Sequence, residues 1–304
     1  MAVIGIDLGG TKVSAALFSP DGELIEKEYR LLNGATGSAV VIAIADTVLA
    51  LRNRRPDLPL EAVGICVPGI VYSKRGTVWA PNIPGWDNYP LLNDLKAVLN
   101  DPSVRIAIES DRTCYILGEV WKGAAAGCTD AIYLAVGTGI GAGILLDGRI
   151  IHGASDIVGA TGWMALEPPY KEEFVPVGCF EYYASGNGIG RQARLLYGDD
   201  SKSSYDVFAN YGNDPVATQI LDKAIQLWGM GAANLVSLFN PQKLIFGGGV
   251  FGPAVRFIDR IYAEACRWGQ PISMREVTFC ASKVGGDAAL LGAAYLGLMQ
   301  TNQY

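Results

Sequence analysis

Residues 3–12 of the chain read VIGIDLGGTK, an apolar run that ends in an acid and enters two glycines. The run Val3–Asp7 predicts a β-strand, and Gly9-Gly10 predict a tight turn after it. Without a Cβ, such a turn brings backbone N–H groups close to phosphate oxygens, and their dipoles favour anions. Thr11 and Lys12 add a hydroxyl group and a positive charge. The stretch therefore predicts a strand that leads into an anion site.

The pattern around this stretch occurs twice along the chain. In the first copy, a tight turn at Asp21-Gly22 joins the strands Val13–Phe18 and Glu23–Tyr29. The second copy has the same order of strand, glycine turn, strand, Asp-Gly turn and strand, at Ala131–Val136, Gly137-Thr138-Gly139, Gly141–Leu146, Asp147-Gly148 and Arg149–Ile151. The repeated order indicates an internal duplication of one supersecondary unit. We expect two related lobes, each offering a glycine turn to a shared cleft between the lobes.

The other apolar segments alternate between strand and helix patterns. Strands are predicted at Leu60–Val67, Val104–Glu109 and Lys243–Phe246, and helices at 38–52, 216–240 and 287–300. Strands that alternate with helices indicate an α/β fold. Residues 167–215 are rich in Pro, Gly, Ser and Asp and predict loops with short helices.

Composition excludes several classes of protein. The chain has 304 residues, 50% of them hydrophobic and 18% charged, so it can bury a large core. A net charge of −6 argues against a nucleic-acid partner. The longest uncharged run, Ala131–Leu146, is broken by glycines and is shorter than the ~20 apolar residues of a membrane span. No targeting segment precedes the first strand, and the six cysteines form no CxxC pair, so we expect a cytoplasmic protein with reduced, buried thiols.

Three glycine turns each follow an apolar strand, at Gly9-Gly10, Gly137-Thr138-Gly139 and Gly247-Gly248-Gly249. Together they predict a polyphosphate site, whereas a P-loop and a dinucleotide-binding fingerprint are absent from the sequence. Asp7 is a candidate ligand of Mg²⁺, directly or through water, because Mg²⁺ prefers carboxylates, water and phosphate oxygens. The alternative is that Asp7 caps its own glycine turn.

A second acid follows the strand Val104–Glu109, in the run Glu109-Ser110-Asp111-Arg112 that leads into a predicted helix. Asp111 could be the N-cap of that helix. Near a polyphosphate, the same position suits a general base that takes a proton from a hydroxyl group.

Seven segments carry a resemblance to a known family. In order along the chain they are IGIDLGGTK (4–12), CVPG (66–69), PNIPGW (81–86), ESDRTCYILGE (109–119), GTGIGAG (137–143), GCFEYYASG (178–186) and FGGGV (246–250). Together they resemble the ROK family of sugar kinases, whose members have the two-lobed, ribonuclease H-like fold of the actin/hexokinase/Hsp70 ATPases. ROK repressors carry a helix-turn-helix domain before the DxGGT strand. Because that strand begins at residue 3 here, we expect a kinase.

The resemblance implies a role for each matching residue. The ATP phosphates and Mg²⁺ would face Asp7, Gly9, Gly10, Thr11 and Lys12 on one lobe and Gly137, Thr138 and Gly139 on the other, and Gly248 and Gly249 would line the adenosine. Asp111 matches the catalytic Asp of the family. Sugar-contacting positions correspond to Gly69, Asn82, Ser110, Asp111 and Glu181.

The implied reaction is in-line transfer of the γ-phosphoryl group of ATP to a hydroxyl of a sugar or sugar-like alcohol. Asp111 would deprotonate that hydroxyl, Mg²⁺ would neutralise the phosphates, and closure of the lobes would exclude water. We expect a small lobe of residues 1–112 and 288–304, a large lobe of residues 113–287, and a homodimer.

The chain departs from the family at the acceptor site. The family's E-x-G-H segment reads Ala160-Thr161-Gly162-Trp163, and only Cys179 remains of the cysteine cluster that binds zinc. One thiol cannot make the four-ligand site of a structural zinc, so we expect no zinc. The lone histidine, His152, is expected on a hairpin surface. Ser110 and Thr113 stand where the family has asparagines.

These replacements argue against plain glucose, because a site without partners for a buried hydroxyl discriminates against it. We expect an acceptor altered at C1 or C2, such as a deoxy, anhydro or amino sugar or a cyclitol. Trp163 could stack on the sugar ring or fill the core where the zinc region was. The alternative for the whole protein is a catalytically silent sugar- or nucleotide-binding protein of the same fold.

Overall fold

In the computed structural model, which describes residues 1–299, the chain folds into two compact units. The first comprises residues 1–127, 149–158 and the chain from residue 286 onward, and the second comprises residues 128–148 and 159–285. Each unit is built around a five-stranded sheet, and one short edge strand of the second sheet, residues 149–150, is grouped with the first unit. Residues 300–304, which end the predicted small lobe, and residue 300 of the predicted helix 287–300 lie outside the described residues.

The first sheet has the strand order β3-β2-β1-β4-β7. Its strands are β1 (Ala2–Leu8), β2 (Lys12–Phe18), β3 (Leu24–Leu31), β4 (Leu60–Val67) and β7 (Arg105–Ser110). The first three form an antiparallel meander, and β4 and β7 run parallel to β1. Between β4 and β7 in the sequence, β5 (Ile70–Tyr72) and β6 (Thr77–Trp79) form a separate two-stranded sheet.

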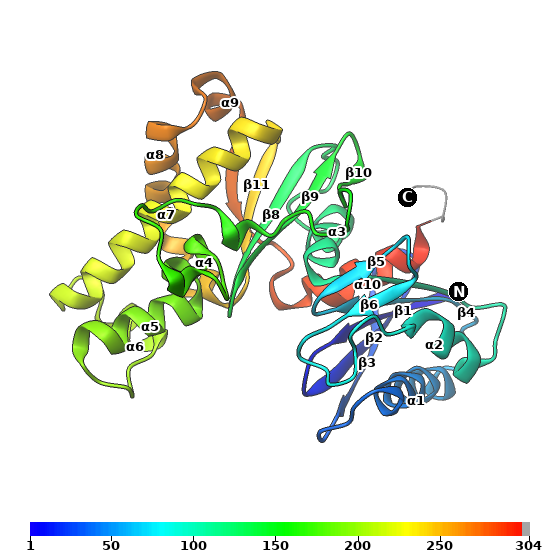
Figure 1. The fold of residues 1–304 in the computed structure, drawn as a ribbon. Coiled ribbons are helices and arrows are strands. Elements are labelled where there is room, and N and C mark those ends of the chain that lie inside the picture. Colours follow the sequence, from blue (N-terminus) through cyan, green and yellow to red (C-terminus); the bar gives the residue numbers. More distant parts are fainter. Residues whose placement is uncertain (300–304) are drawn as a thin grey trace. The chain divides into compact units, whose positions relative to one another are not determined.

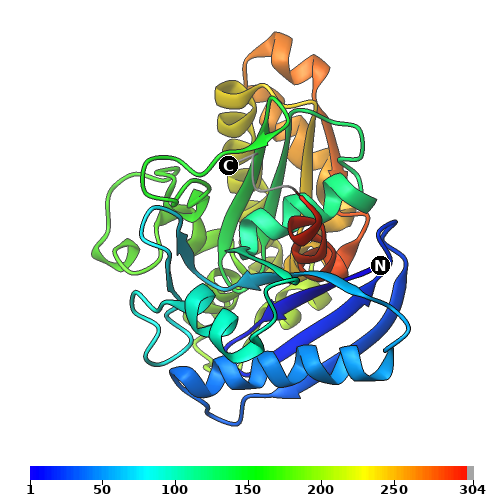
Figure 2. The same ribbon diagram turned by 90° about the vertical axis from the view of Figure 1, so that its right-hand side faces the viewer.

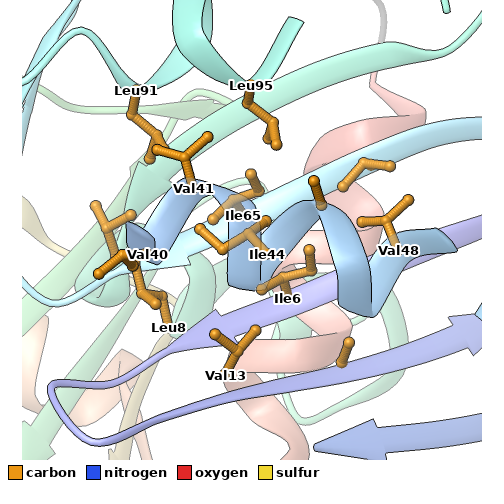
Figure 3. Close-up of a cluster of buried hydrophobic side chains, with 14 of the residues drawn as sticks. Ile6, Leu8, Val13, Val40, Val41, Ile44, Val48, Ile65, Leu91 and Leu95 are labelled. Carbon is orange, nitrogen blue, oxygen red and sulfur yellow. The ribbon is translucent and has the colours of Figure 1, made fainter. Parts of the chain in front are cut away.

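Helices cover both faces of the first sheet (Figures 1 and 2). They are α1 (Ser38–Arg54) and α2 (Leu91–Leu99) on one face, and α3 (Asp111–Lys122) and α10 (Ala288–Leu298) on the other. The apolar residues of α1 recur at helical spacing and form one stripe. Figure 3 shows that stripe packed on the alternate residues of β1 that face it, with Val40, Ile44 and Val48 beside Ile6 and Leu8.

On the opposite face, glycines let α10 lie directly on the strands. An ideal Cβ on Gly64 of β4 would lie 1.6 Å from the carbonyl oxygen of Ala293, and one on Gly5 of β1 would lie 2.1 Å from that of Leu290. Gly292 of α10 is equally close to the backbone of α3. The sequence predicted α10 as a helix of small residues. Its side chains are small because its backbone packs directly on the backbones of neighbouring elements.

The second sheet repeats the topology of the first, in the order β10-β9-β8-β11-β12. Its strands are β8 (Ala131–Val136), β9 (Ile140–Leu146), β10 (Arg149–Ile150), β11 (Lys243–Gly247) and β12 (Thr278–Ala281). β8 is antiparallel to β9 and parallel to β11, just as β1 is antiparallel to β2 and parallel to β4. This equivalence confirms the predicted duplication.

The helices of the second unit include the long helix predicted from the sequence. They are α4 (Cys179–Ala184), α5 (Gly186–Tyr197), α6 (Ser204–Asn210), α7 (Pro215–Phe239), α8 (Ile258–Trp268) and α9 (Pro271–Glu276). Short 3₁₀ helices occur at Thr161–Trp163, Glu172–Phe174, Gly249–Phe251, Pro253–Phe257 and Gly285–Asp287. α7 begins at an Asp214 cap followed by Pro215 and ends at Asn240 with φ +47°, which are typical start and stop signals. The sequence patterns gave no prediction for α2, α8, α9, β5, β6 or β12.

The compact units differ from the predicted lobes in three places, the smallest of which is residues 286–287, which group with the first unit instead of the large lobe. The predicted boundary between residues 112 and 113 falls inside α3, and the whole helix groups with the first unit. Residues 149–158, expected in the large lobe, also group with the first unit. There the Asp156 carboxylate accepts hydrogen bonds from the backbone N–H and the hydroxyl group of Ser73, at 3.1 and 2.9 Å. These two residues are 83 positions apart, so no local pattern connects them.

Two further expectations concern membrane-spanning helices and the cysteine thiols. Among the helices of residues 1–299, none combines the length and the apolar character that crossing a membrane requires. All six cysteines carry free thiols, but only Cys66, Cys114 and Cys179 are buried, and Cys266 is exposed. The expectation of buried thiols therefore holds for half of them.

Replacing Gly64 with Ala should destabilise the first unit by about 1–3 kcal/mol, because the new methyl group would force α10 away from β4. Urea unfolding monitored by circular dichroism would measure the change. Gly286 is the matched control, since a Cβ there meets nothing within 4 Å, and Gly286→Ala should change stability by no more than about 0.5 kcal/mol. Equal stability of the two variants would contradict the close packing of α10.

Candidate active site

The candidate residues of the first unit lie at the carboxyl ends of its parallel strands. In the strand register, Asp7 of β1 is paired with Cys66 of β4, and Cys66 is paired with Glu109 of β7. Gly69 follows the end of β4, and Asp111 follows the end of β7. This edge is where open α/β sheets bind their ligands.

The first glycine turn is closed by a hydrogen bond from the Gly9 N–H to the carbonyl oxygen of Lys12, at 2.9 Å. An ideal Cβ on Gly10 would lie 3.0 Å from the carbonyl oxygen of Asn82, so the turn lies against the segment predicted to contact the acceptor. Gly69 packs more closely still on the end of β6, where an ideal Cβ would lie 2.0 Å from the carbonyl oxygen of Trp79. Gly10, Thr11 and Lys12 are exposed and can reach a ligand.

The Asp7 carboxyl is largely buried, and this burial raises its pKa. A hydrogen bond with the Cys66 thiol and the positive charge of Lys12 lower the pKa in turn. In the turn itself, the Gly9 N–H donates to the Lys12 carbonyl oxygen, and both roles of Asp7, as a ligand of Mg²⁺ and as a cap of its turn, stay predictions.

Asp111 is the first residue of α3, and Ser110 is the N-cap, with its hydroxyl oxygen 3.4 Å from the Thr113 N–H that donates to it. The alternative that Asp111 is the N-cap is therefore wrong. Burial raises the pKa of Asp111 to about 6, and the negative charge of Asp7 adds to this effect. The charge of Arg112 and its N–H, 2.8 Å from Oδ1, act in the opposite direction. A carboxyl with a pKa near neutrality suits a general base.

Ser110, by contrast, is buried and its hydroxyl group is already engaged. It donates to the Thr113 hydroxyl at 3.2 Å in addition to accepting from the Thr113 N–H. Contact between Ser110 and an acceptor stays a prediction. In the structure, the Ser110 side chain caps the start of α3.

The donor chemistry at this edge fits Mg²⁺. Asp7 and Asp111 are two carboxyl groups close enough for the charge of one to raise the pKa of the other. Mg²⁺ is commonly held by one or two carboxylates together with substrate phosphates and water. A cation there would relieve the repulsion between the two acids.

In the second unit, two glycine turns lie side by side at the ends of the parallel strands β8 and β11. Gly248 has φ +86°, and an ideal Cβ on it would lie 2.5 Å from the carbonyl oxygen of Val136. A Cβ on Gly137 would lie 3.9 Å from the backbone nitrogen of Gly249. The backbone is open here, since Gly248 and Gly249 are exposed. Thr138, in the middle of the other turn, is exposed as well. Adjacent turns with bare backbone of this kind suit an anion.

Glu181 of α4 joins the second glycine turn to the segment that replaces E-x-G-H. Its Oε2 accepts a hydrogen bond from the Ile140 N–H at 2.7 Å. A Cβ on Gly139 would lie 2.6 Å from this oxygen, and one on Gly162 would lie 2.9 Å from it. Burial raises the pKa of Glu181, and the Ile140 N–H and the charge of Arg191 oppose the rise. The structure thus brings together a predicted phosphate segment and a predicted acceptor segment.

Trp163 lies on the surface of the second unit, with 56% of its area exposed. Its backbone packs on Gly178, which has φ +83° and on which a Cβ would lie 2.6 Å from the Trp163 Cα. The alternative that Trp163 fills the core is wrong, because the backbone is held while the indole stays outside. The ring is therefore available to a ligand.

Aromatic rings pack together within residues 174–183, the segment that contains Cys179. The Phe174 ring lies 5.3 and 5.8 Å from the rings of Tyr182 and Tyr183, and Arg191 and Lys171 lie over these two tyrosines. Nowhere in residues 1–299 do three or more His, Cys, Asp or Glu side chains form a group that could hold a metal ion.

His152 is not on a hairpin surface, so that expectation is wrong. Its Nε2 lies 2.7 Å from Oε1 of Glu109, and the two side chains are 23% and 10% exposed. The error arises because residues 149–158 pack on the first unit. Neither Glu109 nor His152 was a candidate site residue, although an acid two positions before Asp111 in a chain with one histidine was a usable signal.

Comparisons with known proteins agree with this geometry. The family model described as "ROK family" matches residues 3–300. The glucokinase of Thermotoga maritima is 30% identical over 313 residues, which cover 97% of this chain and 96% of that protein. The structure of the ROK hexokinase from Thermus thermophilus covers 98% of both chains at 29% identity, with a TM-score of 0.84.

A third relative has been solved with ligands. It is a ROK family glucokinase from Streptomyces griseus in complex with glucose and AMPPNP, 29% identical, covering 98% of this chain and 99% of that chain, with a TM-score of 0.76. The sheet order, the glycine turns and these similarities agree over nearly the whole length. The chain therefore belongs to the ROK family and has the two-lobed α/β fold of the actin-like ATPases.

Proposed function

We propose that the protein is an ATP-dependent kinase that transfers the γ-phosphoryl group to a hydroxyl of a sugar or sugar-like alcohol, with Asp111 as general base. The observation that carries this proposal is the buried Asp111 carboxyl, whose pKa is raised to about 6 beside Asp7 and the first glycine turn. The relatives of this chain from Thermotoga maritima and Streptomyces griseus are named glucokinases, and the AMPPNP complex of the second supports ATP as the donor.

The nucleotide would be held by backbone more than by side chains. The proposed contacts are Asp7, Gly9, Gly10, Thr11 and Lys12, then Gly137, Thr138 and Gly139 for the phosphates, and Gly248 and Gly249 for the adenosine. Bound by Asp7, directly or through water, and by phosphate oxygens, Mg²⁺ would neutralise charge on the phosphates. Lys12 adds a positive charge beside the same turn.

At the acceptor, Asp111 accepts the proton of the attacking hydroxyl while that oxygen forms its bond to the γ-phosphorus and the bond to the β-phosphate oxygen breaks. Gly69, Asn82, Ser110, Trp163 and Glu181 are the proposed contacts. Because Ala160 and Trp163 replace a Glu and a His, the site lacks two polar partners for a sugar near C1 and C2. We propose a deoxy, anhydro or amino sugar or a cyclitol as acceptor.

A second candidate is a catalytically silent sugar- or nucleotide-binding protein. The replacement of polar acceptor contacts by Ala160 and Trp163 favours it. The retention of Asp7 and Asp111 argues against it, since binding alone requires neither two repelling acids nor a carboxyl with a raised pKa. We also propose a homodimer, from the family resemblance, and a cytoplasmic location, from the free cysteines.

Replacing Asp111 with Asn should lower the turnover number by about 10²–10⁴-fold while leaving ATP binding intact, because Asn keeps the shape but cannot accept the proton. Release of ADP would be measured for both proteins over a panel of sugars, deoxy, anhydro and amino sugars, and cyclitols. ATP binding by the wild type without turnover of any acceptor would favour the silent binder instead.

The pH dependence should report the same carboxyl. Because the base must be deprotonated, kcat/KM should rise with pH through a midpoint near 6. Replacing Arg112 with Gln removes a charge that lowers the pKa of Asp111, so the midpoint should move to higher pH. A rising limb centred near 4 in the wild type would contradict the assignment of Asp111.

Replacing Trp163 with Ala should raise the KM for the acceptor by about 3- to 10-fold through loss of stacking, and leave the KM for ATP unchanged. Trp268 is the matched control, because it is 55% exposed in the same unit and lies outside the proposed site. Trp268→Ala should change neither constant. An unchanged acceptor KM in Trp163→Ala would contradict stacking.

A further inference from the structure

Glu109 lies two residues before the proposed base, Asp111, and pairs with His152. Glu109 is the next-to-last residue of β7 and is 8% exposed. One carboxylate oxygen, Oε1, is 2.7 Å from His152 Nε2, and the other, Oε2, accepts a hydrogen bond from the Ser110 N–H at 3.0 Å. A buried acid is costly without partners, and these two contacts supply one to each oxygen.

The contacts continue from Glu109 to Asp111 along the backbone. The Ser110 N–H is held by Glu109, and the Ser110 hydroxyl caps α3 through Thr113. Asp111 is the next residue, and its carboxylate accepts from the N–H of Arg112. The place where β7 turns into α3 is therefore tied on one side to His152, and the position of the Asp111 carboxyl depends on that turn.

His152 is itself fixed on the first unit. The Asp156 carboxylate accepts two hydrogen bonds from Ser73, and the Lys74 ammonium group donates to the carbonyl oxygen of Ala154 at 3.3 Å. The carbonyl oxygen of His152 accepts from the Val158 N–H at 3.2 Å. The imidazole is thus presented to Glu109 by a segment with its own anchors.

We propose that His152 is a positioning residue for Asp111, acting through Glu109 and the backbone of Ser110. This proposal rests on the proposed function, because Asp111 needs positioning only if it is the general base. No part of the reaction assigned above uses His152 or Glu109. The imidazole touches neither substrate nor nucleotide in this role.

The charge state of His152 should decide how firmly it holds Glu109. Hydrogen bonding to Glu109 and to the backbone of Ile150, with the negative charge of Asp156, raises the pKa of His152, and burial opposes the rise. An imidazolium has two N–H donors for these partners, whereas a neutral ring has one. The charged pair is complete below the ordinary pKa of about 6.5 and is lost as pH rises through the raised pKa.

The groups that face Asp111 from the packed elements are Asp7 of β1, Arg112 of α3, and the thiols of Cys66 and Cys114. Because its pKa is raised, His152 keeps its charge to a higher pH than a free imidazole does. Turnover should therefore decline at high pH, as His152 loses its proton.

The experiment compares His152→Gln, which keeps an N–H donor but does not titrate, with His152→Leu, which has no donor. His152→Leu should lower kcat by about 10- to 100-fold with an unchanged KM for ATP, and His152→Gln should restore kcat to within about threefold and lack the decline at high pH. Ser73→Ala is the matched control, because it removes one side-chain anchor of this segment and leaves its remaining anchors and the contact with Glu109 in place. It should keep kcat within about twofold.

Because His152 is the only histidine, its imidazole NMR signals can be titrated without any turnover. Its pKa should lie above 6.5 and fall in Glu109→Gln. Equal kcat in His152→Leu and His152→Gln, or a high-pH decline that persists in His152→Gln, would overturn the positioning role alone. A raised histidine pKa in a protein that phosphorylates no acceptor would overturn the proposed function, and the positioning role with it.

Discussion

The parallel pairing of β1, β4 and β7 is the constraint on which the candidate active site depends. Parallel strands end at one edge of a sheet, and the register sets Asp7 beside Cys66 and Cys66 beside Glu109. The same edge holds Asp111 at the start of α3. Burial there, together with the charge of Asp7, raises the pKa of Asp111 to about 6. The ladder of strands therefore sets the proton affinity of the proposed base as well as its position.

The ladder is held from behind by backbone contact. Gly5 and Gly64 let α10 lie on β1 and β4, and Gly292 of α10 would place a Cβ 1.7 Å from the carbonyl oxygen of Cys114 in α3. The helix that begins with Asp111 is thus packed, through α10, on the strands that carry Asp7. Because no flexible side chain separates these elements, a shift of one element must move the others.

The duplicated topology supports different chemistry in its two copies. Both units place glycine turns at the ends of a central strand pair, β1 and β4 in one and β8 and β11 in the other. At the carboxyl ends of the parallel strands, acids stand only in the first unit, where Asp7 is the next-to-last residue of β1 and Asp111 directly follows β7. In the second unit the carboxyl of Glu181 comes from a helix and is engaged by the Ile140 N–H. This difference supports the proposal that proton transfer belongs to the first unit and binding alone to the second.

Local patterns of residue types were enough to predict the strands of the two five-stranded sheets except β12, the glycine turns, the duplication and the positions of Asp7 and Asp111. The sequence also predicted α1 and α7 to within two residues at their ends. Only the tertiary structure decided that Ser110 rather than Asp111 caps α3, that Trp163 is exposed, and that His152 pairs with Glu109, 43 positions away. Burial and hydrogen bonds between distant segments depend on which segments the fold brings together. A pattern of neighbouring residues does not carry that information.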